Sequence, residues 1–481
     1  MNHKKIISLL IGIFILTGCA KEYSAEKDFY KASKIFAEAK NAEITTHGKL
    51  EDVYGPSIEV FQKIVDKYPT SMKTPEALFI IAWIQMKMKN FEQARASLQK
   101  IVSDFSQFGT YGSDARFQIG RIYEWEGQWK EAEEMYWDTA EYHPMQKKGL
   151  YAPIYVFLHY SNSKDKTQDA LNAKQEAFIK AKEYYEGLLK KVGPIQVSAN
   201  IQNYMALLYL AHGDWEKSRE IWLDINKNYP NGSLGPLSLL AAADLTAQRN
   251  QPQEAIALYR KFLDKYPKSP FTKKALAQIG LVHLTSKNYE QARQWLQKAL
   301  DQYEAGKEPE QQAGIELFMA KSYQNEGKWE EAEKAYRELQ KDFPKTDAAL
   351  QVPMLIWTYY HSKGETQKAD AAFKEGVSYF ERFAQDYPQS RLARTARRYR
   401  NFLYGQKGDW NQVVANLDQD MANEKRTELK GNWLFEKAVI TEKQLQDKPK
   451  AIDVYQNFLT HFPNHRLAGM AKTRLEVLTK K

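Results

Sequence analysis

The sequence predicts an all-α protein, an α-solenoid of about eleven helical hairpins with a capping helix at its C-terminal end. Three observations support this fold class. One residue pattern returns at steps of 37 to 48 residues along nearly the whole chain of 481 residues, and such a period is typical of stacked repeats. Each copy has apolar residues spaced three and four apart, as amphipathic helices do. Each copy also contains residues that end helices.

A small side chain in the second helix marks each copy of the pattern. The markers are Ser57, Ala94, Ala132, Ala170, Ser218, Ala255, Ala292, Ala332, Ala369, Val413 and Ala451. Two steps are long, 48 residues from Ala170 and 44 residues from Ala369. A longer helix or an inserted loop explains such a step, and an insertion in a repeat protein tends to lie on one face. Neutral length variation and a partner-binding insertion both remain open.

Glycine followed two residues later by tryptophan predicts the hinge inside a hairpin. The pairs are Gly127 with Trp129, Gly213 with Trp215, Gly327 with Trp329, and Gly408 with Trp410. Glycine adopts the left-handed conformation that ends a helix without steric cost. An aromatic–proline pair, as at Pro267 and Pro344, ends the second helix, because proline cannot continue the hydrogen-bond ladder.

The last helix is expected over residues 466–481. Leu467, Ala471, Leu475 and Leu478 form one apolar stripe there. Each hairpin of such an array buries its apolar face against the next one, so the end of the array needs a cap. We therefore expect the repeat array over residues 24–465 and a capping helix after it.

The small, glycine and aromatic positions resemble the tetratricopeptide repeat over roughly residues 24–465. The period exceeds the usual ~34 residues, and the surplus lies in the turn after the proline. The resemblance implies a right-handed superhelix whose concave groove binds partner proteins. It also implies a scaffold with no catalytic residues, no metal and no cofactor.

The N-terminus has the layout of a secretory signal over residues 1–18. Lys4 and Lys5 precede an apolar run at residues 6–16, and the only cysteine, Cys19, follows Thr17 and Gly18. The run is too short for a membrane span, which takes about 20 apolar residues. The order resembles a bacterial lipobox, which implies a palmitate-bearing lipid anchor on Cys19 and a lipidated tether at residues 19–23. The alternative is an ordinary secreted protein.

Lipobox and repeats together are similar to BamD-like β-barrel assembly lipoproteins and Tol-Pal-associated repeat proteins. In such lipoproteins an acidic residue after the cysteine marks inner-membrane retention, and this chain has Ala20 there. The resemblance implies a lipoprotein of the outer membrane that faces the periplasm, binds envelope proteins and takes part in cell envelope biogenesis. The alternative is an accessory lipoprotein for glycan binding or polysaccharide export, for which the many aromatic residues would suit stacking on sugars.

The sequence lacks the motifs of enzymes and metal sites. His461 and His465 have the spacing of a helical metal pair, but Pro463 stands between them. A net charge of +9 is spread along an exported chain, which argues against nucleic acid as a partner.

One arginine cluster is a candidate partner-binding site. On a helix, Arg391, Arg394 and Arg398 would share one face. They would either bind acidic groups of a partner or form a solvated face with local salt bridges.

Overall fold

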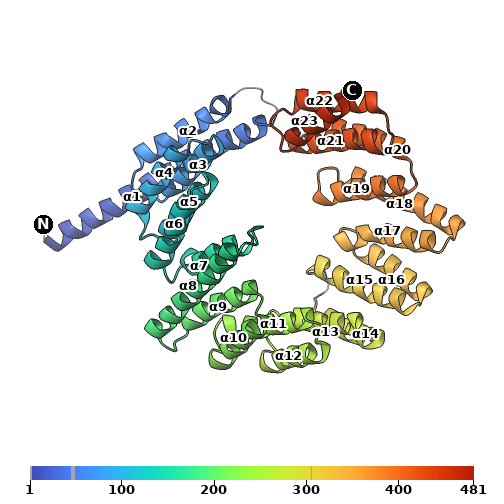
Figure 1. Ribbon diagram of the computed structural model, residues 1–481, viewed down its shortest axis with the longest axis horizontal. Coiled ribbons are helices and arrows are strands. Elements are labelled where there is room, and N and C mark those ends of the chain that lie inside the picture. Colours follow the sequence, from blue (N-terminus) through green and yellow to red (C-terminus); the bar gives the residue numbers. More distant parts are fainter. Residues whose placement is uncertain (1–2, 45–48, 305, 481) are drawn as a thin grey trace. The chain divides into compact units, whose positions relative to one another are not determined.

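The computed structural model describes residues 3–44, 49–304 and 306–480, and for residues 3–19 it describes the backbone alone. Within these ranges the chain forms 23 α-helices and no strand (Figure 1). Consecutive helices pair into hairpins, so the predicted all-α architecture of stacked hairpins is confirmed. The chain divides into two compact units, one of residues Met1–Ala181 and Val414–Lys481 and one of residues Lys182–Val413.

The first unit begins with four hairpins and ends with the last helices of the chain. Its hairpins are α1 (His3–Ala42) with α2 (Leu50–Lys67), α3 (Lys73–Lys87) with α4 (Phe91–Phe105), α5 (Tyr111–Trp125) with α6 (Trp129–Tyr142), and α7 (Lys147–Ser161) with α8 (Gln168–Val192). Its C-terminal part holds α21 (Thr427–Lys443), α22 (Lys448–His461) and α23 (Ala468–Thr479). Helix α8 runs on into the second unit.

The second unit continues the same alternation. Its helices are α9 (Ser198–His212), α10 (Trp215–Asn228), α11 (Leu234–Gln248), α12 (Pro252–Lys265), α13 (Thr272–Thr285), α14 (Tyr289–Leu300), α15 (Pro309–Glu326), α16 (Trp329–Asp342), α17 (Asp347–Ser362), α18 (Thr366–Asp386) and α19 (Arg391–Gln406). Helix α20 (Trp410–Asn423) leads from it into the first unit.

Helix α1 includes the segment expected as signal and tether. The backbone is helical from His3 to Ala42, so residues 19–23 are part of a helix rather than an extended linker. The side chain of Cys19 lies outside the described residues. Within the part of the chain that the structure describes, no helix combines the length and the apolarity needed to cross a membrane.

The small residues in the second helices let the two helices of a hairpin pack closely. All the predicted markers are buried except Ala170, which is partly exposed in the first turn of α8. In that helix the buried small residue is Ala181, and the buried aromatic Tyr185 follows it by one turn. The sequence prediction at Ala170 is wrong because α8 begins earlier than the second helices of its neighbours.

The two long steps therefore arise from long helices. Helix α8 has 25 residues and α18 has 21, whereas α6, α10 and α16 have 14 each. In α18, Gly376 and the buried Phe380 have the spacing that Ala181 and Tyr185 have in α8. The alternative of a longer helix, and not an inserted loop, accounts for most of the surplus residues.

A buried tyrosine ties the two helices of many hairpins together. It lies one turn after the small residue in α6, α12, α16 and α22, and its hydroxyl donates to a polar side chain on the first helix. The bonds are Tyr136 to Glu124 at 3.0 Å, Tyr259 to Asp244 at 2.5 Å, Tyr336 to Gln324 at 2.7 Å and Tyr455 to Glu442 at 2.9 Å. Each bond satisfies a hydroxyl that burial would otherwise leave unpaired.

The helix ends follow the residues that predicted them. Gly213 and Gly327 end α9 and α15 in the left-handed region, with φ of 100° and 88°. Tyr266 and Phe343 end α12 and α16, and the prolines that follow them stop the helix. At the other end of the chain, Leu467, Ala471, Leu475 and Leu478 of the last helical segment pack against the cluster around Tyr455.

Close approach of consecutive helices requires glycine at the start of α7. A Cβ at Gly149 would lie 1.9 Å from the carbonyl oxygen of His143, which ends α6. We expect Gly149→Ala to lower the free energy of unfolding by about 2 kcal/mol, because the backbone must move to relieve the overlap. Chemical denaturation monitored by circular dichroism measures this loss.

Gly187→Ala is the matched control. Gly187 lies inside α8 with open space around its α-carbon, so an added methyl group should stabilise the helix by about 0.5 to 1 kcal/mol. Equal effects of the two substitutions would contradict the close packing at Gly149.

Candidate functional site

Trp129 and Trp329 form two matching junctions between hairpins. Each is the first residue of a second helix and stacks on a ring of the next first helix. The centroid distances are 3.3 Å from Trp129 to His159 and 3.5 Å from Trp329 to Tyr359. The second junction repeats the first 200 residues later in the sequence. Both tryptophans therefore contribute to the contact between neighbouring hairpins.

A hydrogen bond accompanies each stack. Tyr160, next to His159, donates its hydroxyl to Glu133 Oε2 at 2.6 Å, and Trp129 Nε1 donates to the Tyr160 hydroxyl at 2.9 Å. In the second junction the Tyr360 hydroxyl donates to Glu333. Burial and the neighbouring carboxylate raise the pKa of both tyrosines, which keeps the hydroxyls protonated as donors.

The other predicted repeat positions also lie at turns and hinges. Gly127 has a φ of 78° in the turn before α6. Trp215 begins α10, and the guanidinium carbons of Arg219 and Arg249 lie 5.8 Å and 5.5 Å from its ring. Pro267 and Pro344 follow the last residues of α12 and α16. These positions shape the hairpins, and nothing at them resembles a ligand site.

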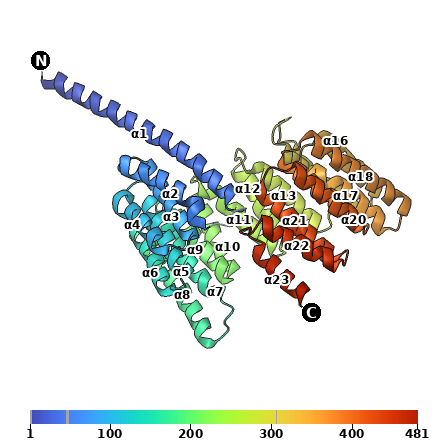
Figure 2. The same cartoon turned by 90° about the horizontal axis from the view of Figure 1, so that it is seen from above.

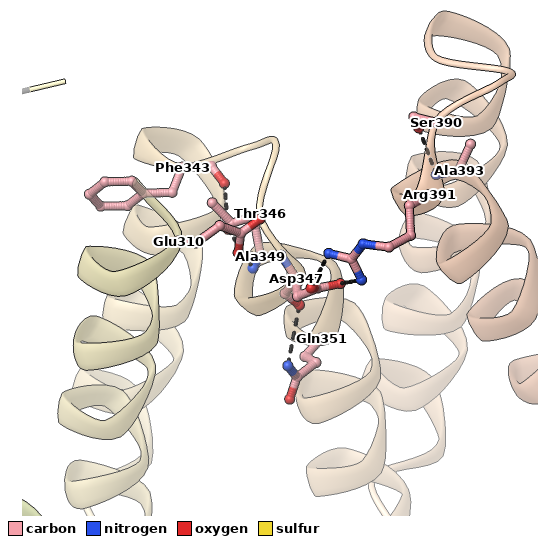
Figure 3. Close-up of polar contacts among 9 residues, drawn as sticks. All are labelled: Glu310, Phe343, Thr346, Asp347, Ala349, Gln351, Ser390, Arg391 and Ala393. Atoms are coloured by element: carbon pink, nitrogen blue, oxygen red, sulfur yellow. Dashed lines mark hydrogen bonds and ion pairs between the residues drawn. The ribbon is translucent and has the colours of Figure 1, made fainter. Parts of the chain in front are cut away.

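The predicted arginine face is only partly open, and Figure 3 shows its first member, Arg391. Arg391, at the start of α19, forms a bidentate ion pair with Asp347, the first residue of α17; Arg391 Nη1 lies 3.2 Å from Asp347 Oδ1. The Asp347 backbone amide donates to Glu310 Oε2 at 3.1 Å. Arg391 thus connects the first helices of two neighbouring hairpins.

The ion pair is a weak link by itself. The side chains of Arg391 and Asp347 are 62% and 42% exposed, and water and salt screen the attraction between exposed charges. Arg394 donates to the carbonyl oxygen of Ser390 at 3.3 Å, whereas Arg398 is exposed beside the ring of Tyr399. The three arginines do not form a common unpaired ladder, since Arg391 and Arg394 have partners within the chain.

A second candidate surface lies on the first helices of the first unit. We call it the aromatic row: Phe79 and Trp83 of α3, Phe117 and Trp125 of α5, and Tyr151 and Tyr155 of α7. Trp83 is 39% exposed and Trp125 is 53% exposed. The Phe117 ring lies 5.2 Å from that of Tyr155 and 6.1 Å from that of Tyr151, so the row continues from one hairpin to the next.

Cations accompany the aromatic row. Lys148 Nζ lies 4.4 Å from the centre of the Phe117 ring, and the Arg121 guanidinium carbon lies 5.7 Å from that of Trp125. Arg121 Nε is buried without a hydrogen-bond partner in the described ranges. Phe117 is buried, so the exposed rings of the row are Trp83 and Trp125, and tryptophan and arginine are enriched among the residues that dominate binding energy at protein interfaces. This surface was not predicted from the sequence, although Arg121 and Trp125 have the four-residue spacing of one helix face.

Glu316 of α15 is the most perturbed acidic side chain of the second unit. Burial, together with the nearby carboxylates of Asp342 and Glu338 on α16, raises its pKa to about 7. Three carboxylates in one region suggest a cation site, but among the described residues no group of His, Cys, Asp and Glu has the geometry to hold a metal ion. The feature is a titratable contact between the two helices of a hairpin.

Comparison with known families agrees with the repeat pattern. Residues 236–305 match one model of the tetratricopeptide repeat, and residues 76–107, 204–232 and 319–346 match another. These four segments of the chain therefore match the tetratricopeptide repeat. No curated protein matches the chain.

Two solved structures are similar to this chain. The crystal structure of yeast Tom70 is 14% identical with a TM-score of 0.36, and the match covers 95% of this chain and 96% of that one. The crystal structure of a variant of the nearly identical TPR-like repeats of a putative kinesin light chain from Podospora anserina is 15% identical with a TM-score of 0.31. That match covers 40% of this chain and 93% of the other.

Removal of a junction tryptophan should destabilise the tetratricopeptide array. We expect Trp329→Ala to cost on the order of 3 kcal/mol, because it removes the stack on Tyr359 and leaves a cavity. Trp125→Ala is the control, since that ring is largely exposed and its loss should change stability by less than about 0.5 kcal/mol. Thermal unfolding of both variants tests this, and an unchanged melting temperature for Trp329→Ala would refute the packing role.

The raised pKa of Glu316 predicts a pH-dependent stability. The folded state holds the Glu316 proton more tightly than the unfolded state, whose pKa is near 4.5. The contribution of Glu316 to the free energy of unfolding is therefore fully present below pH 4.5, and it is lost as the pH rises to about 7. Glu316→Gln should remove that loss, which we expect to be about 1 to 2 kcal/mol after solvent screening. Urea denaturation of both proteins between pH 4.5 and 8 measures the difference, and parallel curves would contradict the assignment.

Proposed function

We propose that this chain is a non-enzymatic scaffold that binds partner proteins on the aromatic row of its first unit. The observation that carries the proposal is a row of aromatic rings on consecutive first helices, in which Trp83 and Trp125 are exposed and Arg121 and Lys148 lie beside the row. Tetratricopeptide arrays present an extended surface rather than a closed pocket, which suits a protein partner. The partner's acidic and apolar side chains would meet the cations and the rings.

We further propose that the scaffold is anchored by a lipid on Cys19 to the outer membrane and faces the periplasm. The support is the order of Lys4, Lys5, the apolar run and the only cysteine of the chain, together with Ala20 after it. Several acyl chains hold a protein stably on a bilayer, whereas one does so only weakly. A partner bound in this place belongs to the cell envelope, and envelope biogenesis is the role that follows.

The partner site is tested by crosslinking the full-length protein in envelope preparations of its host. We expect the combined variant Arg121→Ala and Trp125→Ala to lower the yield of the main crosslinked partner at least about tenfold, because both groups are of the kinds that form binding hot spots. Phe402→Ala is the control, since that ring is 43% exposed on α19 in the second unit. Undiminished crosslinking of the double variant would contradict the site.

The anchor is tested separately with Cys19→Ser. Labelled palmitate should enter the natural protein and not the variant, and the variant should leave the membrane fraction. A natural protein whose mature N-terminus carries no fatty acid would overturn the anchor and leave the partner site standing.

Glycan binding is a second candidate function. The exposed rings of Trp83 and Trp125 are of the kind that stack on sugar rings. Titration calorimetry with envelope oligosaccharides distinguishes the two functions. A heat of binding that the natural protein shows and Trp125→Ala lacks would favour glycan binding.

A further inference from the structure

A groove lies along the first hairpin, between α1 and α2, which run side by side (Figure 2). Its volume is about 670 Å³. Apolar side chains form its floor: Ala32 and Ile35 from α1, and Val60 and Ile64 from α2. Charged side chains form its rim: Asp28, Lys31, Lys63, Asp66 and Lys67. The groove therefore combines an apolar base with charges along both walls.

The corresponding edge is buried in the later hairpins. In the second hairpin this edge carries Ala77 and Ile84 of α3. Both residues of α3 are fully buried, and Ile84 packs in a cluster with Ala39 and Tyr54 of the first hairpin.

The same pair of positions is buried further along the array. The residues are Ala115 and Ile122 in α5, Ile201 and Leu208 in α9, and Ala275 and Val282 in α13. These positions therefore lie on the edge of each hairpin that packs against the preceding hairpin. Asp28 and Ile35, in contrast, are only partly buried.

The two ends of the array differ in this respect. Helix α23 packs on the last hairpin with Leu475 and Leu478, as the end of an array requires. The edge of the first hairpin is open in the described ranges, although the same edge is buried in the hairpins that begin with α3, α5, α9 and α13. The groove is therefore the first hairpin's copy of the surface through which each later hairpin packs against the hairpin before it.

The charges on the rim define the chemistry of the occupant. Lys67 Nζ pairs with Asp28 Oδ2 at 3.1 Å, and Asp66 Oδ1 accepts a hydrogen bond from Gln62 at 2.8 Å. Lys31 on one wall and Lys63 on the other make no ion pair within the described residues. The rim therefore carries three lysines against two carboxylates, and a lysine without an ion pair stands on each side of the apolar floor.

We propose that this groove binds an amphipathic helix of a partner protein, with an apolar stripe along one side and acidic residues on both flanks. The stripe covers Ile35 and Val60, and the flanking carboxylates pair with Lys31 and Lys63. A second copy of this chain fits poorly, because a symmetric contact through the same groove would bring its lysines against those of the first copy. The groove is a separate site from the aromatic row, and it does not depend on the lipid anchor.

The probe is a fluorescent 18-residue peptide designed as a helix, with leucines at positions i, i+3, i+4 and i+7 and glutamates on both flanks. A second peptide has lysines in place of the glutamates. Binding to the detergent-solubilised full-length protein is followed by fluorescence anisotropy. We expect the glutamate peptide to bind at least about tenfold more tightly than the lysine peptide, since the rim charges oppose the latter.

Charge reversal in the protein completes the test. Lys31→Glu combined with Lys63→Glu should reverse the preference between the two peptides. Both lysines are exposed, so the double variant should fold as the natural protein does, and thermal unfolding checks this. Lys130→Glu is the control, because Lys130 is exposed on α6, outside the groove, and makes no ion pair within the described residues. It should leave both affinities unchanged.

Three results would overturn the proposal. The first is equal affinity for the two peptides, and the second is an unchanged preference after the double reversal. The third is a dimer, detected by sedimentation, that Ile35→Asp dissociates and that the glutamate peptide does not, which would show a second copy as the occupant.

Discussion

Close contact between the two helices of each hairpin is the constraint on which the rest of the structure depends. A small residue such as Ala132 or Ala332 lets the helices approach, and the tyrosine one turn later fills the space beside it. The tyrosine hydroxyl then bonds to Glu124 or Gln324 on the opposite helix. Burial of the ring is favourable only because this bond satisfies the hydroxyl. The remaining apolar surface of each hairpin is left for its neighbour.

Local patterns predicted the hairpins well because their causes are local. Gly327 ends a helix through its own backbone freedom, and Pro344 stops one through its own ring. The prediction of Ala170 as the small residue of its hairpin was wrong because its cause is not local. The length of α8 depends on packing along all of its 25 residues and not on any single residue. Periodicity alone did not reveal which small residue would meet the facing helix.

Surface sites were harder to predict, because they combine residues from different hairpins. The partner of Arg391 is Asp347, which lies 44 residues earlier in the chain, and no local pattern connects the two. The aromatic row likewise takes its rings from three hairpins. The groove of the first hairpin was not predicted, because its floor residues Ile35 and Val60 lie on different helices and only the structure shows that they are partly exposed.

The matching junctions at Trp129 and Trp329 have a consequence for how the two units differ. Framework residues agree across the interval of 200 residues: Gly127 with Gly327, Tyr136 with Tyr336, and Glu133 with Glu333. The outward residues do not, because Trp125 corresponds to Asn325, Arg121 to Lys321, and Tyr155 to Leu355. The same buried framework therefore occurs twice, but the exposed side chains around it differ. A molecule that binds the surface of one copy would not find the same side chains on the other.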